Sequence, residues 1–381
     1  MKSIIKSIIY HLLLIKAILL IKYLKIKNYD NICLLISNGL NLTGAPLVLL
    51  ETAKIYKKNG YKVLILSETF GPLIKEYNKE KINTVIINGN KTKIINELLT
   101  INFSFIIVNT IVMYKYINKL NYLNIPTIWW LHEGTTYINQ YKNLIPRRLS
   151  KNITVLGVSN IVKEALVKYK FNYNVKILNY GIKDFYKVNS NKKIDKNKVK
   201  IAVIGTIYER KNQIFAIETF KKLPKNIKNK VELIFLGKPN CIKDKYYLKF
   251  INLINTDKRI KYIKMVERKN MYNFFQTIDI ILCCSTDDPL PVVITEGLLL
   301  KKLVIVNSNV GQYSIIENNI NGYKYKVDSQ EELINTIIQI INSKHSWENV
   351  QNNARLLYQK FFSLTAFEVN LLNYTNSILH K

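Results

Sequence analysis

Two carboxylates with seven residues between them stand at the head of an apolar segment. The stretch DDPLPVVITEGLLLKKLVIVN, residues 287–307, places Asp288 and Glu296 on either side of two prolines. Proline lacks an amide hydrogen and has a fixed φ, so the prolines exclude a central strand and favour a loop that enters a helix. One segment can then offer a carboxylate to one group, backbone amides to an anion, and a second carboxylate to another group. A nucleotide sugar has three matching parts: sugar hydroxyls, a diphosphate and a ribose diol.

Two adjacent cations follow a glycine turn earlier in the chain. In GTIYERKNQ, residues 205–213, Gly205 ends an apolar run, and Arg210 and Lys211 precede a helical pattern. Cations beside a helix N-terminus suit a diphosphate, because the helix dipole and the exposed N–H groups already favour anions there. The alternative is a solvated helix start in a lysine-rich chain.

A second glycine loop lies near the beginning of the chain. In NGLNLTGAPLVLL, residues 38–50, Gly39 and Gly44 separate an apolar run from a helical pattern. A glycine at such a place lets a phosphate approach the backbone, although a pair of glycines also makes an ordinary tight turn.

The segment WWLHEG, residues 129–134, places His132 and Glu133 at the end of an apolar run. A histidine in such a loop can act as an acid, a base or a hydrogen-bond donor near neutral pH, or it can be structural. Trp130, just before it, either packs in the core or offers an aromatic face to a sugar.

Short apolar runs alternate with amphipathic stretches, and this alternation predicts the elements that hold these residues. Near-continuous apolar strands separated by helices indicate a parallel sheet covered on both faces. The expected strands are 31–37, 62–67, 83–88, 104–109, 127–132 and 154–159, and then 200–205, 231–237, 259–265, 279–285 and 303–308. The fold class is therefore α/β, with two doubly wound Rossmann-like domains facing each other across a cleft. Ligands bind at the carboxyl ends of such strands, which is where the loops described above lie.

A polar, Asn- and Lys-rich stretch at residues 179–200 is typical of an interdomain linker or a long surface loop. The expected organisation is a basic apolar helix, a first Rossmann-like domain, a second Rossmann-like domain and a closing segment. These parts are residues 1–30, 31–180, 181–360 and 361–381.

Composition limits the function classes. The chain has 381 residues, 48% of them hydrophobic, which is enough for two cores, and a formal net charge of +31. Only six of its 57 basic residues are arginine, which favours a generally basic surface over a nucleic-acid site, where bidentate arginines gather. The four cysteines show neither metal-ligand nor disulfide spacing, so a reduced cytoplasm fits them best.

The first thirty residues are rich in Ile, Leu and Tyr but are interrupted by six lysines. The longest run without charge, residues 7–15, is far shorter than the roughly 20 residues that span a bilayer. Two interpretations remain: a basic helix lying in an anionic membrane interface, and a helix that covers the first domain without contacting lipid.

Taken together, these segments resemble the GT-B glycosyltransferases, in the large retaining family 4, over roughly residues 31–381. The segment from Asp288 is similar to the family's E-x7-E motif, with Glu296 as its second Glu and Asp288 where the first Glu is usual. GTIYERKNQ is similar to the family's glycine, arginine and lysine loop. Lys211 matches the lysine, and Thr206 stands where Arg is commonest.

The resemblance implies that residues 31–180 form the N-terminal acceptor domain, that residues 181–360 form the C-terminal nucleotide-sugar domain, and that residues 361–381 form a terminal helix crossing back to the first domain. It also implies the roles of the residues. The transferred sugar would contact Asp288, the ribose hydroxyls would bind Glu296, and the cations would stabilise the charge on the leaving diphosphate. The catalytic residues would be His132, Arg210, Lys211 and Asp288; the donor-binding residues Gly44, Gly205, Leu290, Val292 and Glu296; and the residues on the acceptor side Trp130 and Glu133.

The resemblance also implies a function. It predicts transfer of a hexose from a nucleotide-diphospho-sugar to a saccharide or lipid-linked acceptor with retention of configuration, in cell-surface glycan synthesis. No metal and no cofactor besides the donor substrate is expected. The partners would be donor, acceptor and an anionic membrane touched peripherally from the cytoplasm, without nucleic acid. The alternatives are a member that binds a sugar nucleotide without transferring it, suggested by Thr206 and Asp288, and a sugar-nucleotide epimerase.

Overall fold

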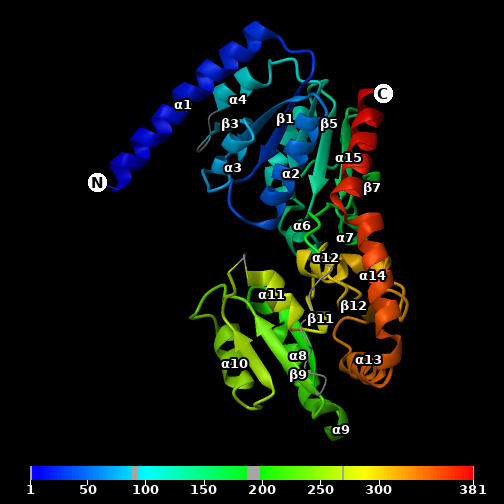
Figure 1. The fold of residues 1–381 in the computed structure, drawn as a ribbon. Coiled ribbons are helices and arrows are strands. Elements are labelled where there is room, and N and C mark those ends of the chain that lie inside the picture. Colours follow the sequence, from blue (N-terminus) through cyan, green and yellow to red (C-terminus); the bar gives the residue numbers. More distant parts are fainter. Residues whose placement is uncertain (1, 88–91, 187–197, 268–269, 381) are drawn as a thin grey trace. The chain divides into compact units, whose positions relative to one another are not determined.

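The computed structural model describes residues 2–87, 92–186, 198–267 and 270–380, with side chains from residue 12 onward. The chain forms two compact units (Figure 1). Unit 1 comprises Met1–Val158, Val162–Tyr180 and Glu368–Lys381, and unit 2 comprises Ser159–Ile161 and Gly181–Phe367. Much of the expected linker, residues 187–197, lies outside the described residues.

Unit 1 contains a seven-stranded, fully parallel sheet in the order β3-β2-β1-β4-β5-β6-β7. Its strands are β1 (Ile32–Ser37), β2 (Lys62–Ser67), β3 (Asn83–Ile86), β4 (Phe105–Asn109), β5 (Thr127–Leu131), β6 (Ile153–Gly157) and β7 (Val175–Ile177). Its helices are α1 (Lys2–Lys27), α2 (Gly44–Lys58), α3 (Ile74–Lys79), α4 (Thr92–Leu98), α5 (Tyr114–Leu120), α6 (Thr135–Tyr141), α7 (Asn160–Lys168) and most of α15 (Leu364–Leu379).

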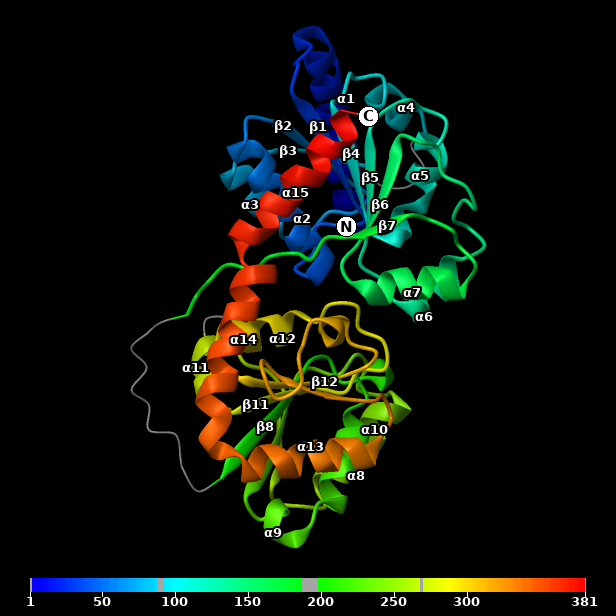
Figure 2. The ribbon, with the colours of Figure 1, turned by 90° about the vertical axis from the view of Figure 1, so that its right-hand side faces the viewer.

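The C-terminal helix completes one face of unit 1. Within this unit α15 runs beside α2, as Figure 2 shows, and the buried hydroxyl groups of Tyr56 and Thr375 lie 2.5 Å apart. At the surface, Lys58 of α2 pairs with Glu368 at 2.9 Å. Helix α1 packs at the edge of the sheet formed by β3, where it contacts β3 and α4 (Figure 1).

Unit 2 contains a six-stranded parallel sheet in the order β10-β9-β8-β11-β12-β13. Its strands are β8 (Val199–Ile204), β9 (Val231–Leu236), β10 (Ile260–Ile263), β11 (Ile280–Cys283), β12 (Leu303–Asn307) and β13 (Tyr323–Tyr325). Its helices are α8 (Gln213–Lys222), α9 (Lys225–Lys228), α10 (Lys245–Ile254), α11 (Met271–Gln276), α12 (Val292–Leu299), α13 (Gln330–Asn342) and α14 (Trp347–Phe361).

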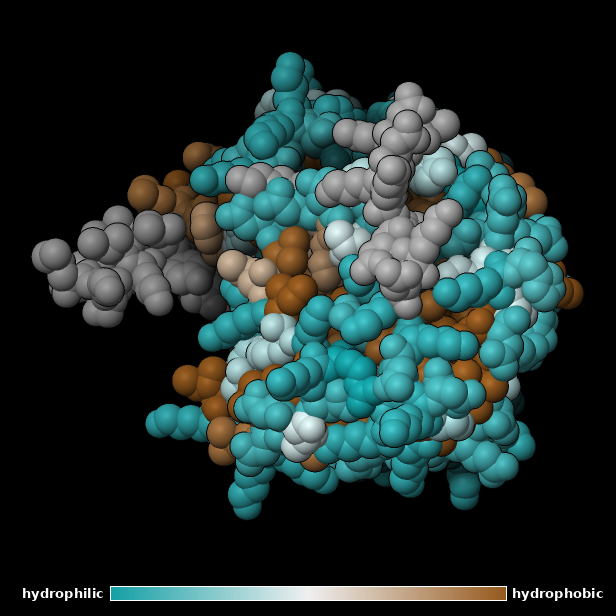
Figure 3. Space-filling view, turned by 60° about the horizontal axis from the view of Figure 1, so that its bottom comes forward, coloured by the Kyte–Doolittle hydropathy of each residue, from teal (hydrophilic) through white to brown (hydrophobic). Residues whose placement is uncertain are grey.

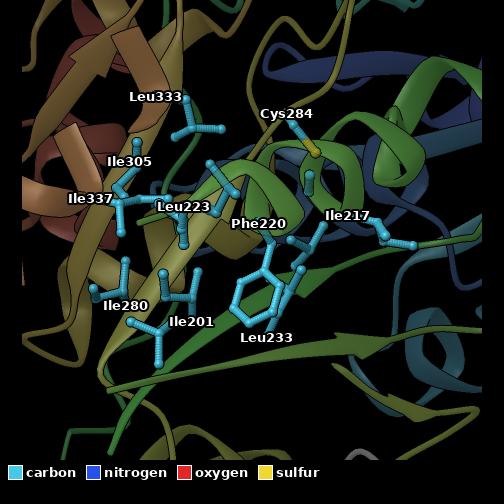
Figure 4. Close-up of a cluster of buried hydrophobic side chains, with 14 of the residues drawn as sticks. Ile201, Ile217, Phe220, Leu223, Leu233, Ile280, Cys284, Ile305, Leu333 and Ile337 are labelled. Atoms are coloured by element: carbon cyan, nitrogen blue, oxygen red, sulfur yellow. The ribbon is translucent and has the colours of Figure 1, made fainter. Parts of the chain in front are cut away.

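Two helical layers enclose the sheet of unit 2. Figure 4 shows side chains of α8 and α13 packed over alternate residues of the strands, among them Phe220, Ile337 and Ile305. Cys284 joins this apolar cluster, so its thiol acts as a small hydrophobic group. Figure 3 shows one face of the molecule, on which hydrophilic side chains predominate and smaller hydrophobic areas lie among them. The expectation of two doubly wound α/β domains is confirmed by this architecture.

Candidate active site

The candidate residues of unit 2 gather where the strand order reverses. β8 and β11 are neighbours in the sheet, although 75 residues lie between the end of β8 and the start of β11 in the chain. β12 lies on the other side of β11. Such a reversal leaves a crevice at the carboxyl ends of the strands, because the two connections leave in opposite directions. The loops that follow β8, β11 and β12 all emerge at this edge.

The loop after β8 makes a close turn that depends on glycine. Gly205 has a φ of +149°, and a Cβ on Gly237 would lie 1.9 Å from the Gly205 carbonyl oxygen. Lys211 folds back over this turn, since its side chain lies 3.6 Å from the position that a Cβ on Gly205 would take. Arg210 and Lys211 belong to a short 3-10 helix, Glu209–Lys211, directly ahead of α8.

Lys211 and Asp288 form an ion pair through Nζ and Oδ2. Their side chains are only 19% and 11% exposed, so little water screens the pair. Desolvation by itself would lower the pKa of Lys211, but the Asp288 carboxylate outweighs it and the pKa is raised. The ammonium group therefore keeps its charge, and the Ser285 hydroxyl adds a long contact of 3.4 Å to the same Oδ2.

Arg210 is held by two oxygen atoms. Its Nε donates to the Tyr208 hydroxyl at 2.7 Å, and its Nη1 donates to the Asp287 carbonyl. The guanidinium thus bridges the loops after β8 and β11. Arginine carries five N–H donors, so these two bonds leave capacity for an anion.

Backbone hydrogen bonds connect the loop after β11 to the loop after β12. The Asp288 N–H donates to the Asn309 carbonyl, and the Gly311 N–H donates to the Asp288 carbonyl, both at 3.0 Å. The Asn309 side chain donates to the Thr286 carbonyl at 2.7 Å. A Cβ on Gly311 would lie 1.6 Å from the Pro289 carbonyl oxygen, so only glycine permits this approach. The carboxylate of Asp288 is positioned by backbone on both sides.

Glu296 lies on α12, and the next residue, Gly297, determines how closely this helix approaches the sheet. A Cβ on Gly297 would lie 2.7 Å from Ile281 and 2.9 Å from Val304, so glycine lets the helix approach β11 and β12 closely. No side chain caps the start of α12, and its first turn contains no acidic residue. The helix start at Val292 therefore favours an anion, and buried Leu290 shapes the loop that leads to it.

In unit 1, Glu133 joins the ends of β4 and β5. Its Oε2 accepts hydrogen bonds from the backbone N–H of Ile111 at 3.0 Å and of His132 at 2.9 Å. Desolvation raises the pKa of Glu133 to about 7, although these N–H groups favour the charged form. The carboxylate is committed to its own backbone, which makes Glu133 a residue that positions its neighbour.

That neighbour, His132, lies between two aromatic rings. Its ring centroid lies 4.8 Å from that of Trp130 and 6.3 Å from that of Tyr180, which is stacked on it. Desolvation lowers the pKa of His132 to about 3, so the imidazole is neutral at physiological pH. The Nε2 atom is buried and has no protein hydrogen-bond partner. A neutral imidazole can serve as a hydrogen-bond partner, which is one of the roles expected for His132.

The expectation that Trp130 faces an acceptor needs correction. Its side chain is fully buried, and its Nε1 donates to the Leu178 carbonyl at 3.3 Å. β5 is a central strand covered on both faces, so an indole there has no free surface for a sugar. Trp130 fills the core of unit 1 and supports His132.

Gly44 begins α2 in the loop after β1, and β1 adjoins β4 at the point where the order of this sheet reverses. A Cβ on Gly44 would meet no atom within 4 Å, and its φ lies outside the left-handed range. The fold alone therefore does not require glycine here, in contrast to Gly311. Close approach of a ligand remains a reason for it.

Several residues that position the site were missed from sequence. Thr110 directly follows β4 and has a φ of +80°, which is rare for a β-branched residue, and its hydroxyl is buried without a hydrogen-bond partner. Its strained backbone orients the Ile111 N–H toward Glu133. Ser285, Asn307 and Asn309 fix the loops of unit 2. In a chain so rich in asparagine, residue type alone gave no signal for them.

Two further features concern ligands and membranes. Within residues 2–87, 92–186, 198–267 and 270–380, no group of three or more His, Cys, Asp or Glu side chains is arranged to hold a metal ion. Over the same part of the chain, no helix combines the length and the apolar character needed to cross a bilayer.

Two family models match the chain. Residues 30–156 match the model described as glycosyl-transferase family 4, and residues 185–357 match glycosyl transferases group 1. The first match lies in unit 1 and the second in unit 2, where the cations and carboxylates described above lie. The chain belongs to the GT-B glycosyltransferases of the family 4 type.

Solved structures share the fold. Alr3699/HepE of Anabaena in complex with UDP superposes with a TM-score of 0.76 at 18% identity, covering 91% of this chain and 100% of that one. A glycosyltransferase from Rickettsia africae gives 0.72 at 21% identity, covering 92% and 99%. The lipopolysaccharide outer core galactosyltransferase WaaB gives 0.71 at 11% identity, covering 91% and 99%. No curated protein sequence matches the chain.

Proposed function

We propose that this glycosyltransferase transfers a hexose from a nucleotide-diphospho-sugar to a saccharide or lipid-linked acceptor, with retention of configuration. One observation carries the proposal: Arg210, Lys211, Asp288 and the start of α12 meet at the reversal point of the unit 2 sheet. Cations and an uncapped helix start suit a diphosphate, and a carboxylate suits sugar hydroxyls.

The proposed reaction breaks the bond between the sugar C1 and the diphosphate oxygen and forms a bond from C1 to the acceptor oxygen. Negative charge grows on the leaving diphosphate, and Arg210 and Lys211 stabilise it electrostatically in a site with little water. If the acceptor attacks from the face that the diphosphate leaves, the leaving phosphate oxygen is the nearest base for the acceptor proton. Retention then requires neither a protein nucleophile nor a metal ion.

The remaining residues are proposed to hold the substrates. Glu296 accepts hydrogen bonds from both ribose hydroxyl groups, one on each oxygen of its charged carboxylate. Asp288 exchanges part of its pairing with Lys211 for hydroxyl groups of the donor sugar, which frees the lysine toward the diphosphate. His132 is the neutral hydrogen-bond partner of the transferred sugar, oriented by Glu133 and Trp130.

The donor and acceptor are proposed from the likeness to solved structures. HepE was solved with UDP-glucose, so UDP-hexoses are the first donors to test. WaaB is a lipopolysaccharide outer core galactosyltransferase, which supports a lipid-linked acceptor and a role in cell-surface polysaccharide synthesis. A peripheral contact with anionic membrane from the cytoplasm would accompany such an acceptor.

A donor screen tests the proposal. The full chain is incubated with UDP-, GDP- and dTDP-sugars, with and without a trial saccharide acceptor, and donor consumption is measured together with the anomeric configuration of the product. Consumption that requires an acceptor and yields a retained linkage is expected. Conversion of the donor without acceptor would indicate an epimerase, and binding without consumption would indicate a member that only binds sugar nucleotides.

A further inference from the structure

Helix α1 has two apolar faces on opposite sides. The inner face carries Ala17, Ile21 and Leu24, which are buried against the rest of unit 1, where β3 and α4 lie (Figure 1). Their spacing of four and three residues places them on one side of the helix. The sequence left open whether this segment covers the first domain, and in the structure it does so with this face.

The outer face is also apolar, although the protein leaves it exposed. Its members follow a spacing of three or four residues, so they form one continuous stripe. The outer stripe is Leu12, Ile15, Leu19, Tyr23 and Ile26. Leu19 is 62% exposed and Ile26 is 82% exposed. At about 100° per residue, the stripe lies opposite the buried face.

Lysines border the outer stripe on both edges. On a helical projection Lys16 and Lys27 lie along one edge, and Lys22 lies along the other. All three are exposed, and residues 12–27 contain no acidic side chain. Long lysine stems can lie along an apolar surface while their ammonium groups reach outward.

The orientation of the helix is fixed by a separate contact. Lys25, on the side toward α4, donates to Glu97 at 2.6 Å. A hollow of about 550 Å³ lies beside this contact, and its walls include Ile18 and Ile94, so apolar surface continues from the helix toward α4. The outer stripe therefore cannot pack against unit 1 unless α1 first detaches from β3 and α4.

We propose that α1 stays docked on unit 1 and lies in the plane of an anionic lipid surface, with the outer stripe inserted among the acyl chains and the bordering lysines at the headgroups. This inference rests on the proposed peripheral membrane contact and names the surface that makes it. A helix whose apolar stripe is bordered by lysines matches the chemistry of an anionic membrane interface, because the stripe can enter the acyl region while the ammonium groups meet the headgroups.

A second copy of the chain is the competing occupant. Two copies that paired through this stripe would be related by twofold symmetry, which would bring their lysine borders together without any acid in the stripe to compensate. Five side chains on one helix also present far less than the roughly 800 Å² per partner that stable interfaces bury. Both considerations favour lipid.

The test uses the full chain and vesicles of phosphatidylcholine, with and without phosphatidylglycerol. Sedimentation should show strong binding only to the anionic vesicles. The Ile15→Glu/Leu19→Glu variant should lose at least about tenfold in partitioning for each substituted side chain. Replacing Lys16, Lys22 and Lys27 by glutamine should lower partitioning onto anionic vesicles about fivefold per charge removed, and raising the salt concentration should also lower it.

A matched control lies elsewhere on the same unit. Val167, on α7, is 63% exposed and lies among exposed lysines, so Val167→Glu introduces the same charge on a comparable site outside the stripe. This control should bind vesicles as the unchanged chain does. Circular dichroism and the melting temperature establish that each variant is folded.

Three results would overturn the inference: equal binding to neutral and anionic vesicles, unchanged binding by the Ile15→Glu/Leu19→Glu variant, or a dimer in light scattering that this variant dissociates. Vesicle binding needs neither acceptor nor turnover. A chain that binds anionic vesicles but transfers no sugar would contradict the proposed function alone, and one that glycosylates a soluble acceptor but ignores vesicles would contradict this inference alone.

Discussion

Replacing Lys211 by methionine should destabilise unit 2 and slow turnover through two separable effects. Breaking a fully buried ion pair costs about 3–5 kcal/mol, and breaking an exposed one costs about 0–1 kcal/mol. With Lys211 and Asp288 at 19% and 11% exposure, the pair lies nearer the buried case, so we expect a loss of ~2–4 kcal/mol. For a domain of this size that loss lowers the Tm by roughly 4–16 °C.

A double-mutant cycle isolates the pair. Asp288→Asn alone should also destabilise unit 2, because it leaves an ammonium group without its carboxylate. The Lys211→Met/Asp288→Asn variant should be more stable than the sum of the single variants predicts, by ~1–3 kcal/mol. Of the three tryptophans, only Trp347 lies in unit 2, where its Nε1 donates to the Ile340 carbonyl. Fluorine NMR of the 5-fluorotryptophan-labelled chain therefore reports on unit 2 separately.

Kinetics then separate structure from chemistry. Below the unfolding transition, Lys211→Met should lower kcat more than tenfold, which corresponds to about 1.4 kcal/mol of transition-state stabilisation. Lys211→Arg, which keeps the charge, should lower it less. Strictly additive destabilisation in the cycle would show that the ion pair does not couple the loops. An unchanged kcat with a raised KM would show that the lysine binds substrate and transition state alike.

Four further predictions follow from the site. Glu296→Gln should reduce turnover severely, since a neutral amide offers the ribose hydroxyls one acceptor oxygen instead of two and no charge, and near-normal kinetics would refute the ribose assignment. Gly44→Ala should leave the free energy of unfolding unchanged or raise it by up to about 1 kcal/mol through helix propensity, while raising the KM for the donor; an unchanged KM would leave the glycine without a ligand role. Because burial raises the pKa of Glu133 from its ordinary 4.5 to about 7, the folded state binds this proton more tightly than the unfolded state, so the stability of unit 1 should fall as pH rises from 4.5 to 7. Glu133→Gln should flatten that dependence in thermal melts followed by the 5-fluorotryptophan signals of Trp129 and Trp130 in unit 1, and a dependence that survives the substitution would point to another group. EDTA should leave turnover intact, and a loss restored by Mg²⁺ or Mn²⁺ would contradict the metal-free mechanism.

The strands that hold the site were predictable because they are buried on both faces. Runs such as NICLLIS and DIILCCS contain four to six consecutive apolar residues, which is the signature of a parallel sheet covered by helices. β7 and β13 were missed, since Val175–Ile177 and Tyr323–Tyr325 are three-residue edge strands with a lysine at the centre. An edge strand needs only one partner, and such a short segment has no run to recognise.

The contacts within the site were not predictable to the same extent. Lys211 and Asp288 were each chosen from their local segments, but their ion pair depends on β8 lying beside β11, an order that apolar runs do not reveal. The burial of Trp130 could have been inferred from its place in an apolar strand, because both faces of such a strand are covered. The strain at Thr110 arises from its tertiary surroundings and leaves no trace in residue type.

The buried contact between Tyr56 and Thr375 has a consequence for how the protein is made on the ribosome. Unit 1 is encoded almost entirely before residue 181, but it is completed by α15, whose Leu371 and Thr375 are fully buried. At ~5–20 residues per second, translation reaches the residues after 367 roughly 10–40 s after it passes residue 180. During that interval the nascent unit 1 exposes the apolar groove that α15 later fills. Chaperones that shield apolar surface should therefore associate with the nascent chain until the last helix leaves the exit tunnel.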